Sequence, residues 1–300
     1  MSSLSCLNVV KRQPGSSTRP PISPLYVDVA MVGDRSGSMA STKGGSQEGA
    51  VMYMKKQKEN NETVKPKLGY FIDFISFDDE PNSLYFGEAN AITTDTLTDI
   101  SIGMSPCGGT RLYDTVVECL QKQISRLEEV YKNLNKTTQN LVDNCPWLIA
   151  ATFAIMTDGQ DNRSTLNTIQ DCKKLMKIYK KKYSGTALFI GANQDAKRTA
   201  QKFGIDEDSS LQMGTDRRSS YNAASAIASA QIRAVSSGGG ISCHTPAFTQ
   251  LERQESSVRR VLTFDNDSDS DSDYCIDLSM PPPLPPPLQL CRGNRIINHS

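Results

Sequence analysis

Residues 25–33 read LYVDVAMVG, and residues 34–39, which follow directly, read DRSGSM. The first stretch is apolar and rich in β-branched residues, which indicates a buried β-strand. The second places one carboxylate and two hydroxyls, Asp34, Ser36 and Ser38, at alternating positions of a short loop that contains glycine. Such oxygen donors suit Mg²⁺ or Mn²⁺ and suit zinc poorly. Taken alone, the loop is more simply explained as a polar turn.

Two further segments favour a metal site over a simple turn. Residues 107–115, CGGTRLYDT, place Thr110 after a Gly-Gly turn and before a long helical pattern. Residues 154–162, AIMTDGQDN, are an apolar strand that ends in Asp158 just before a glycine turn. Ligands of open parallel α/β sheets bind outside the carboxyl ends of the strands. We therefore expect all three loops to meet at one edge of a sheet.

The five oxygen-bearing residues of these loops resemble the complete metal-ion-dependent adhesion site (MIDAS) of von Willebrand factor type A (VWA) domains, in the family's order: Asp34, Ser36, Ser38, Thr110 and Asp158. The resemblance implies a bound Mg²⁺ or Mn²⁺, with the three hydroxyls as direct or nearly direct ligands. It implies that the two aspartates act largely through bound water. It also implies that an acidic side chain of a protein partner fills an open position on the ion.

The residues around these loops leave smaller questions open. Asp161 and Asn162 are expected either to cap the following helix or to brace the loop. Asp114 is expected at the start of a helix or behind the metal ligands. Gly33 departs from the family, which generally has an apolar strand residue at that place, and is expected to loosen the end of the strand.

The order of patterns predicts an α/β fold: a doubly wound, mostly parallel sheet flanked by helices, VWA-like or Rossmann-like. The family implies that the short strand at residues 83–86 is antiparallel and lies at the sheet edge. Strand patterns occupy residues 25–33, 67–77, 83–86, 147–156, 186–190 and 210–213, and helix patterns occupy residues 46–54, 116–134, 166–179, 196–203 and 220–235.

Composition divides the chain into three parts. Residues 1–23, rich in serine and proline, are expected to be a flexible leader, and residues 24–237 to be the VWA domain. Residues 238–300 are expected to be a disordered acidic and proline-rich tail. Within that tail, residues 265–273 read DNDSDSDSD, a block of like charge that cannot bury itself.

The tail carries two short motifs. Ile276, Asp277 and Leu278 follow the acidic run and resemble a SUMO-interacting motif, which would add a strand to the edge of a partner's sheet. A merely solvated tail is the alternative. A proline-rich run is expected to form a polyproline II rod that WW or SH3 domains recognise, or else an inert spacer; its central residues are Pro282, Pro283, Leu284 and Pro285.

Charge, hydropathy and cysteine usage exclude several classes of protein. The formal net charge is zero, so no basic field favours nucleic acid. No apolar run approaches the roughly 20 residues that cross a bilayer, and the first residues do not resemble a secretory signal. The eight cysteines show no C-x-x-C pair, so we expect an intracellular, reducing setting, cytoplasmic or nuclear.

The sequence therefore predicts a metal-dependent protein-binding or scaffold module. A substrate-recruiting component of the ubiquitin or SUMO machinery is a second hypothesis, although no RING finger is present. A metal-dependent, phosphatase-like hydrolase is the third. It is disfavoured because the chain lacks a G-x-x-x-x-G-K-[ST] loop and because its two histidines, His244 and His299, lie in the expected tail. We accordingly predict that the chain is not an enzyme.

Overall fold

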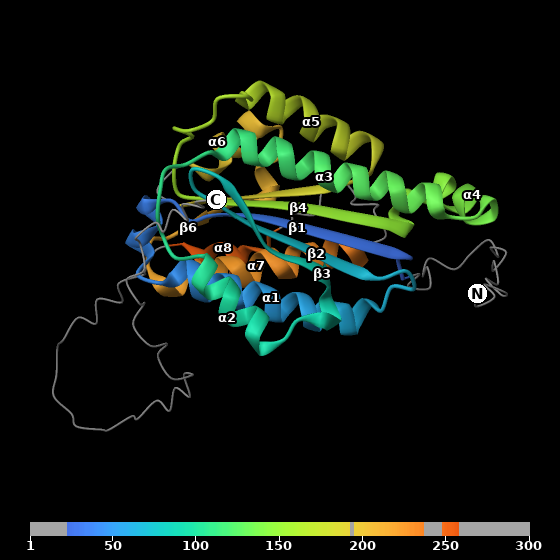
Figure 1. The fold of residues 1–300 in the computed structure, drawn as a ribbon, viewed down its shortest axis with the longest axis horizontal. Helices are drawn as coiled ribbons and strands as arrows, with labels where there is room; N and C mark the ends of the chain where they lie inside the picture. Colours follow the sequence, from blue (N-terminus) through green and yellow to red (C-terminus); the bar gives the residue numbers. More distant parts are fainter. Residues whose placement is uncertain (1–22, 193–194, 237–247, 258–300) are drawn as a thin grey trace, which may run out of the picture. The chain divides into compact units, whose positions relative to one another are not determined.

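The computed structural model describes residues 23–192, 195–236 and 248–257, which all belong to the first of two units, Met1–Arg260. A six-stranded sheet forms the centre of this unit, in the order β3-β2-β1-β4-β5-β6 (Figure 1). All neighbouring strands are parallel except the antiparallel pair β2–β3. The strands are β1 (Tyr26–Asp34), β2 (Tyr70–Phe77), β3 (Pro81–Glu88), β4 (Ile149–Thr157), β5 (Thr186–Ala192) and β6 (Ser210–Met213).

Helices cover both faces of the sheet, with α1, α2 and α7 on one side and α3, α5 and α6 on the other (Figure 1). The fold is therefore α/β, doubly wound and mostly parallel, with its antiparallel strand at one edge, which confirms the predicted fold class. The helices are α1 (Gly45–Val64), α2 (Thr94–Gly103), α3 (Leu112–Asn133), α4 (Lys136–Asn144), α5 (Ile169–Lys182), α6 (Ala196–Phe203), α7 (Arg217–Ser236) and α8 (Gln250–Ser256).

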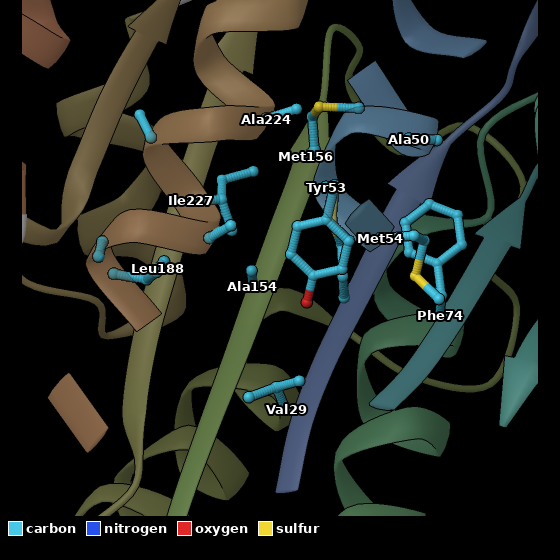
Figure 2. Packing of buried hydrophobic residues seen from close by; sticks show 14 of the residues in the cluster. Val29, Ala50, Tyr53, Met54, Phe74, Ala154, Met156, Leu188, Ala224 and Ile227 are labelled. Atoms are coloured by element: carbon cyan, nitrogen blue, oxygen red, sulfur yellow. The ribbon is translucent and has the colours of Figure 1, made fainter. Parts of the chain in front are cut away.

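Strands β1 and β4 lie in the middle of the sheet, and every residue of both is buried. Their continuous apolar sequence follows from this position, because helices cover both faces of a central parallel strand. Side chains alternate between two hydrophobic clusters, so that Val29 packs on the α1 side and Ala30 on the α3 side. Figure 2 shows the first cluster, in which Tyr53 and Met54 of α1 lie over the sheet.

The connections leave β1 and β4 in opposite directions. From β1 the chain passes through α1 to β2 on one side, and from β4 it passes through α5 to β5 on the other. The crevice at the carboxyl ends of these two strands is therefore the topological switch point, where open α/β sheets bind their ligands.

Two helices and one helix start differ from the sequence patterns. Helices α2 and α4 were not predicted, because few of their side chains are buried and no apolar stripe marks them. Leu166 was expected in the helix before β5 but precedes it and is 76% exposed. Helix α5 begins only after Thr168, which forms a capping box with Asp171.

The folded part continues beyond residue 237, where the sequence placed the end of the domain. Phe248 is fully buried, and α8 packs against α7 and β6. Arg253 of α8 donates hydrogen bonds to the carbonyl oxygens of Ser210 and Asp208. The predicted boundary was too early because a glycine-rich stretch, residues 238–240, separates this short helix from the rest.

Several predictions concern residues that lie outside the described part of the chain. These are the leader up to residue 22, the acidic run and the two tail motifs around Ile276 and Pro283. They stay predictions. Within the described ranges, no helix is both long and apolar enough to cross a membrane.

A buried ion cluster ties α3 to the sheet. Arg126 of α3 donates two hydrogen bonds to Asp28 of β1, at 3.0 and 3.1 Å, and one to Asp73 of β2, at 2.7 Å. Both carboxylates are almost fully buried, and burial raises the pKa of Asp73. The arginine is therefore the counter-charge that allows two carboxylates to lie inside the fold.

We predict that Arg126→Met lowers the free energy of unfolding by about 3 to 5 kcal/mol, because it leaves two buried carboxylates unpaired. Urea denaturation measures the loss. The control Arg217→Met breaks a more exposed pair with Glu48 and should cost less than about 1 kcal/mol. The triple variant Asp28→Asn, Asp73→Asn, Arg126→Met should recover much of the stability, and equal losses in both single variants would contradict the prediction.

We also predict that Phe248→Ala lowers the free energy of unfolding by about 3 kcal/mol, because it empties a fully buried aromatic site. Leu251→Ala is the matched control in the same segment; its side chain is 61% exposed, so its effect should stay within about 0.5 kcal/mol. Thermal or urea unfolding of the two variants gives the comparison. A Phe248→Ala variant as stable as the wild type would show that α8 is not part of the fold.

Candidate metal centre

The carboxyl ends of β1 and β4 bring the two aspartates of the predicted site together. Asp34 is the last residue of β1, and Asp158 follows β4 directly, with Gly33 opposite Met156 in the parallel register. The hydroxyl of Thr157 donates a 2.6 Å hydrogen bond across the strands to Oδ2 of Asp34. The first carboxylate is thus held in place by the strand that carries the second.

A chain of hydrogen bonds connects the two aspartates through the serines. Oδ1 of Asp34 accepts a 2.7 Å bond from the backbone N–H of Ser36. The hydroxyl oxygens of Ser36 and Ser38 lie 2.9 Å apart, and Ser38 donates a 2.7 Å bond to Oδ1 of Asp158. The alternating sequence D-x-S-x-S therefore directs all three polar groups to the same point at the sheet edge.

Thr110 reaches this point from the loop before α3. A methyl group placed on Gly159 would lie 3.5 Å from the Thr110 hydroxyl and 3.9 Å from the Ser38 hydroxyl, so both hydroxyls lie next to the same glycine. The backbone of the two loops is joined by a 3.1 Å bond from the N–H of Gly37 to the carbonyl oxygen of Gly108. The structure thus brings together all five side chains that the sequence singled out.

Asn162 and Asp161 brace the Thr110 loop, which was one of the two expectations for them. The side-chain oxygen of Asn162 accepts a 2.9 Å bond from the N–H of Thr110, and its own N–H donates to the carbonyl of Thr110 at 3.0 Å. Asp161 accepts a 3.2 Å bond from the N–H of Tyr113 in the first turn of α3. The other expectation is wrong, because Thr168 caps the following helix, α5.

Gly33 has a packing role that the sequence did not reveal. A methyl group on this residue would lie 3.2 Å from Cε of Met104 and 3.7 Å from the ring of Phe74. Met104 is fully buried against the end of β1, and the absence of a side chain at residue 33 leaves room for it. Gly33 remains paired in the sheet, so the expected loosening of the strand end is not observed.

An acidic turn, residues 78–80, joins the three loops and was not recognised from the sequence. Its three carboxylates pair with one arginine from each loop, and these pairs are Asp78 with Arg35 at 2.8 Å, Asp79 with Arg163 at 3.0 Å, and Glu80 with Arg111. The signal was present as three consecutive acids after a strand and an arginine in every site loop. Only the fold shows that they face one another.

Burial affects the charge of the site. Asp34 is fully buried, and this desolvation raises the pKa of its carboxyl to about 6, although hydrogen bonds from Thr157 and Ser36 oppose the shift. The nearby charge of Asp158 raises it further, and burial also raises the pKa of Asp158. Among the described residues neither carboxylate forms an ion pair, whereas Ser38 is exposed and opens the site to solvent.

These residues fit a divalent cation with oxygen ligands. Two desolvated carboxylates without a counter-charge lie beside three hydroxyls, and the whole donor set is hard oxygen. No group of three or more histidine, cysteine, aspartate or glutamate side chains in the described ranges could hold a metal, so a thiolate or imidazole site is not present there. The candidate centre depends on its hydroxyls.

Comparison with known proteins gives likenesses of fold. No protein-family model and no curated protein matches the chain. Solved structures that match include a von Willebrand factor type A protein from Catenulispora acidiphila (TM-score 0.45, 14% identity, 70% of this chain and 43% of that chain). Another is proximal thread matrix protein 1 from the mussel byssus with a zinc-occupied MIDAS motif (0.45, 16%, 68% and 47%).

A third is the vWF domain of the type V pili tip protein Mfa5 from Porphyromonas gingivalis (TM-score 0.41, 13% identity, 72% of this chain and 96% of that chain). The chain spans less than half the length of the first two of these solved chains. Similarity at this level carries no information about a ligand or partner of this protein.

Asp114 stabilises the site from the start of α3. Its carboxylate accepts hydrogen bonds from the N–H groups of Thr165 at 3.0 Å and Asn167 at 2.7 Å, and from the Arg111 guanidinium at 3.0 Å. Burial works against ionisation, but these donors outweigh it and lower the pKa of Asp114 to about 2. Asp114 thus holds the loop between Asp158 and α5 against α3.

We predict that Asp114→Asn lowers the free energy of unfolding by about 2 kcal/mol at pH 7. A lowered pKa stabilises the fold above the usual pKa of 3.8, and this contribution is lost as the pH falls from about 4 to about 2. The difference from wild type in urea denaturation should therefore shrink between pH 5 and pH 3. The control Asp99→Asn, an exposed carboxylate of α2, should show little difference at either pH, and a pH-independent effect of Asp114→Asn would contradict the assignment.

Proposed function

We propose that this protein binds a partner protein through a divalent cation held by Asp34, Ser36, Ser38, Thr110 and Asp158. The observation that supports this most directly is the hydrogen-bonded chain from Asp34 through Ser36 and Ser38 to Asp158 at the switch point of the sheet. It places two carboxylates that lack a counter-charge among the described residues beside three hydroxyls, of which that of Ser38 reaches solvent. A module of this kind is a binding or scaffold protein.

The residues of the chain have distinct tasks in this proposal. Asp34 orients the loop through the N–H of Ser36 and is itself fixed by Thr157. Asp158 orients the hydroxyl of Ser38, and Asn162 fixes the backbone of Thr110. The cation, when bound, supplies positive charge that attracts an anionic ligand. Because the direct ligands would be neutral hydroxyls, with the two aspartates acting largely through bound water, the ion would keep positive character, and a carboxylate of the partner completes the site.

Mg²⁺ or Mn²⁺ is the cation that the oxygen donors favour. Zinc is tested beside them as a divalent cation that a set of hard oxygen donors favours less. The proposed partner presents an acidic side chain, and neither nucleic acid nor a membrane is invoked. An intracellular setting, cytoplasmic or nuclear, remains part of the proposal and agrees with the free thiols of three described cysteines, Cys119, Cys145 and Cys172.

No described residue favours the two other hypotheses. Recruitment of ubiquitin or SUMO substrates rests on tail residues outside the described ranges. The absence of catalysis stays a prediction. Hydrolysis of p-nitrophenyl phosphate with Mg²⁺ or Mn²⁺ that is lost in Asp34→Ala would contradict it.

The metal site is tested by thermal unfolding and calorimetric titration of the full chain in chelator, Mg²⁺, Mn²⁺ and Zn²⁺. A cation at ten times its Kd should stabilise the wild type by about 1.4 kcal/mol. Asp158→Asn should abolish this gain and the calorimetric signal. In chelator the variant should be at least as stable as wild type, because it removes a charge that opposes ionisation of Asp34.

Asp206→Asn, an exposed carboxylate outside the five-residue donor set, is the control and should respond to metal as wild type does. The same metal response in Asp158→Asn would show that the ion binds elsewhere. Absence of any metal response in the wild type, with and without an acidic peptide, would refute the proposed function.

A further inference from the structure

The three ion pairs of the acidic turn differ in how much of each pair is buried. Arg35 and Asp78 have side chains that are only 22% and 11% exposed. Arg111 is 16% exposed and is shared between Glu80 and the buried Asp114. These two arginines are enclosed, and their removal would leave buried acids unpaired, so they belong to the structure of the loops.

The pair of Arg163 and Asp79 is different, because its side chains are 61% and 54% exposed. An ion pair at this level of exposure contributes roughly 0 to 1 kcal/mol, so it can be exchanged for another at little cost. Asp79 would not be left without a donor, since its Oδ1 also accepts a 3.1 Å bond from the N–H of Gly109. Arg163 is therefore the arginine of this cluster that is able to change its partner.

The position of Arg163 is fixed relative to the candidate metal centre. The backbone N–H of Arg163 donates a 3.2 Å hydrogen bond to the carbonyl oxygen of Thr110, whose side chain is one of the proposed ligands. Its side chain lies across Gly109, where an added Cβ would be only 2.6 Å from both Cγ and Nε of the arginine. Gly109 thus leaves space that brings an exposed guanidinium next to Thr110.

We propose that Arg163 binds a second carboxylate of the partner, in exchange for Asp79, while the first carboxylate binds the cation. The inference rests on the proposed function and specifies its ligand as a segment with two acidic side chains. Alternate side chains of an extended segment point the same way and are about 6.6 Å apart, which suits one ion and one neighbouring guanidinium. The fork of arginine nitrogens binds a carboxylate through two parallel hydrogen bonds, which adds selectivity.

The partner segment is therefore of the type acid-x-acid, and Arg163 is a specificity-determining residue. Asp79 occupies the guanidinium when no partner is present, so that an exposed cation does not attract unrelated anions. Asp79 also makes the site selective for two acids, because a ligand with one carboxylate has no second carboxylate that could replace Asp79 at Arg163.

The test uses the full chain in a host variant in which the acids of the run 265–273 are changed to asparagine, so that the chain does not supply alternating acids itself; these are Asp265, Asp267, Asp269, Asp271 and Asp273. The probes are two fluorescent peptides with amidated C-termini, Gly-Ser-Asp-Ser-Ser-Gly and Gly-Ser-Asp-Ser-Asp-Gly, which therefore carry one and two carboxylates. Their affinities are measured by anisotropy or NMR titration in 5 mM Mg²⁺ and in chelator, at fixed ionic strength.

We expect the host to bind the two-acid peptide about tenfold more tightly than the one-acid peptide in Mg²⁺, and to bind neither in chelator. Arg163→Gln should remove this preference and leave the affinity for the one-acid peptide within about twofold. Arg163→Lys should keep part of the preference. Asp79→Asn should raise the affinity for the two-acid peptide about threefold, because Arg163 is then unoccupied. Arg217→Gln, an arginine paired elsewhere on the surface, should change nothing.

Four outcomes would overturn the inference. A preference that persists in Arg163→Gln would mean that another group binds the second acid. Equal weakening of both peptides by this variant would assign Arg163 a purely structural role in the Thr110 loop. Mg²⁺-dependent binding of both peptides with equal affinity would leave the proposed function intact and refute this inference alone, whereas absence of Mg²⁺-dependent binding to either peptide would refute both.

Discussion

The parallel pairing of β1 with β4 is the constraint on which the candidate centre depends. It sets Asp34 and Asp158 at adjacent strand ends and lets Thr157 hold the first carboxylate across the strands. A one-residue slip of β1 would turn each of its side chains to the opposite face of the sheet. Both strands are buried on both faces, so such a slip would disturb two hydrophobic clusters together. The hydrophobic core of the protein thus fixes the geometry of the candidate metal centre.

The sheet also carries buried charge at two separate places, which hydrophobic packing does not explain. Two carboxylates of the centre lack a counter-charge among the described residues, whereas the pair Asp28 and Asp73 on the α3 side has Arg126 between its members. The contrast separates two uses of buried acids. One set is neutralised within the chain and fastens a helix to the sheet. In the proposed function the other set is left for an external cation, which would link binding to local stability.

The sequence predicted the features that arise from interactions between residues close in the chain. It did not reveal those that arise from contacts between distant segments. Continuous apolar runs identified β1 and β4, and a compact amphipathic pattern identified α6 with its observed bounds. The five polar residues were recognisable because strand ends and glycine turns fix where they emerge. The pairs of residues 78–80 with three arginines arise only when loops distant in sequence meet, so no local pattern shows them.

Short helices form a second class that the sequence concealed. Helix α8 is held by Phe248 and Arg253 against β6 and α7, and seven residues carry too little periodicity to reveal this. Helix α4 had a visible start signal, since Asn135 caps it through the N–H of Thr138, but it lacked an apolar stripe. Leu166 is the opposite case, because this apolar residue at helical spacing lies in a loop whose backbone N–H groups donate hydrogen bonds to Asp114.

Helix α3 also determines where the protein can be attached to a surface without covering the candidate centre. It starts beside Thr110 and continues for 22 residues, a length of about 33 Å, so its far end is remote from the candidate centre. Helix α4 adjoins that far end (Figure 1). Lys136 is exposed at the start of α4. A single anchoring group at that position would attach the molecule to a sensor surface with its sheet edge facing the solution. The acidic turn, residues 78–80, is in contrast a poor place to modify the protein. Although it is a short surface connection, an insertion there would separate it from the three loops that pair with it.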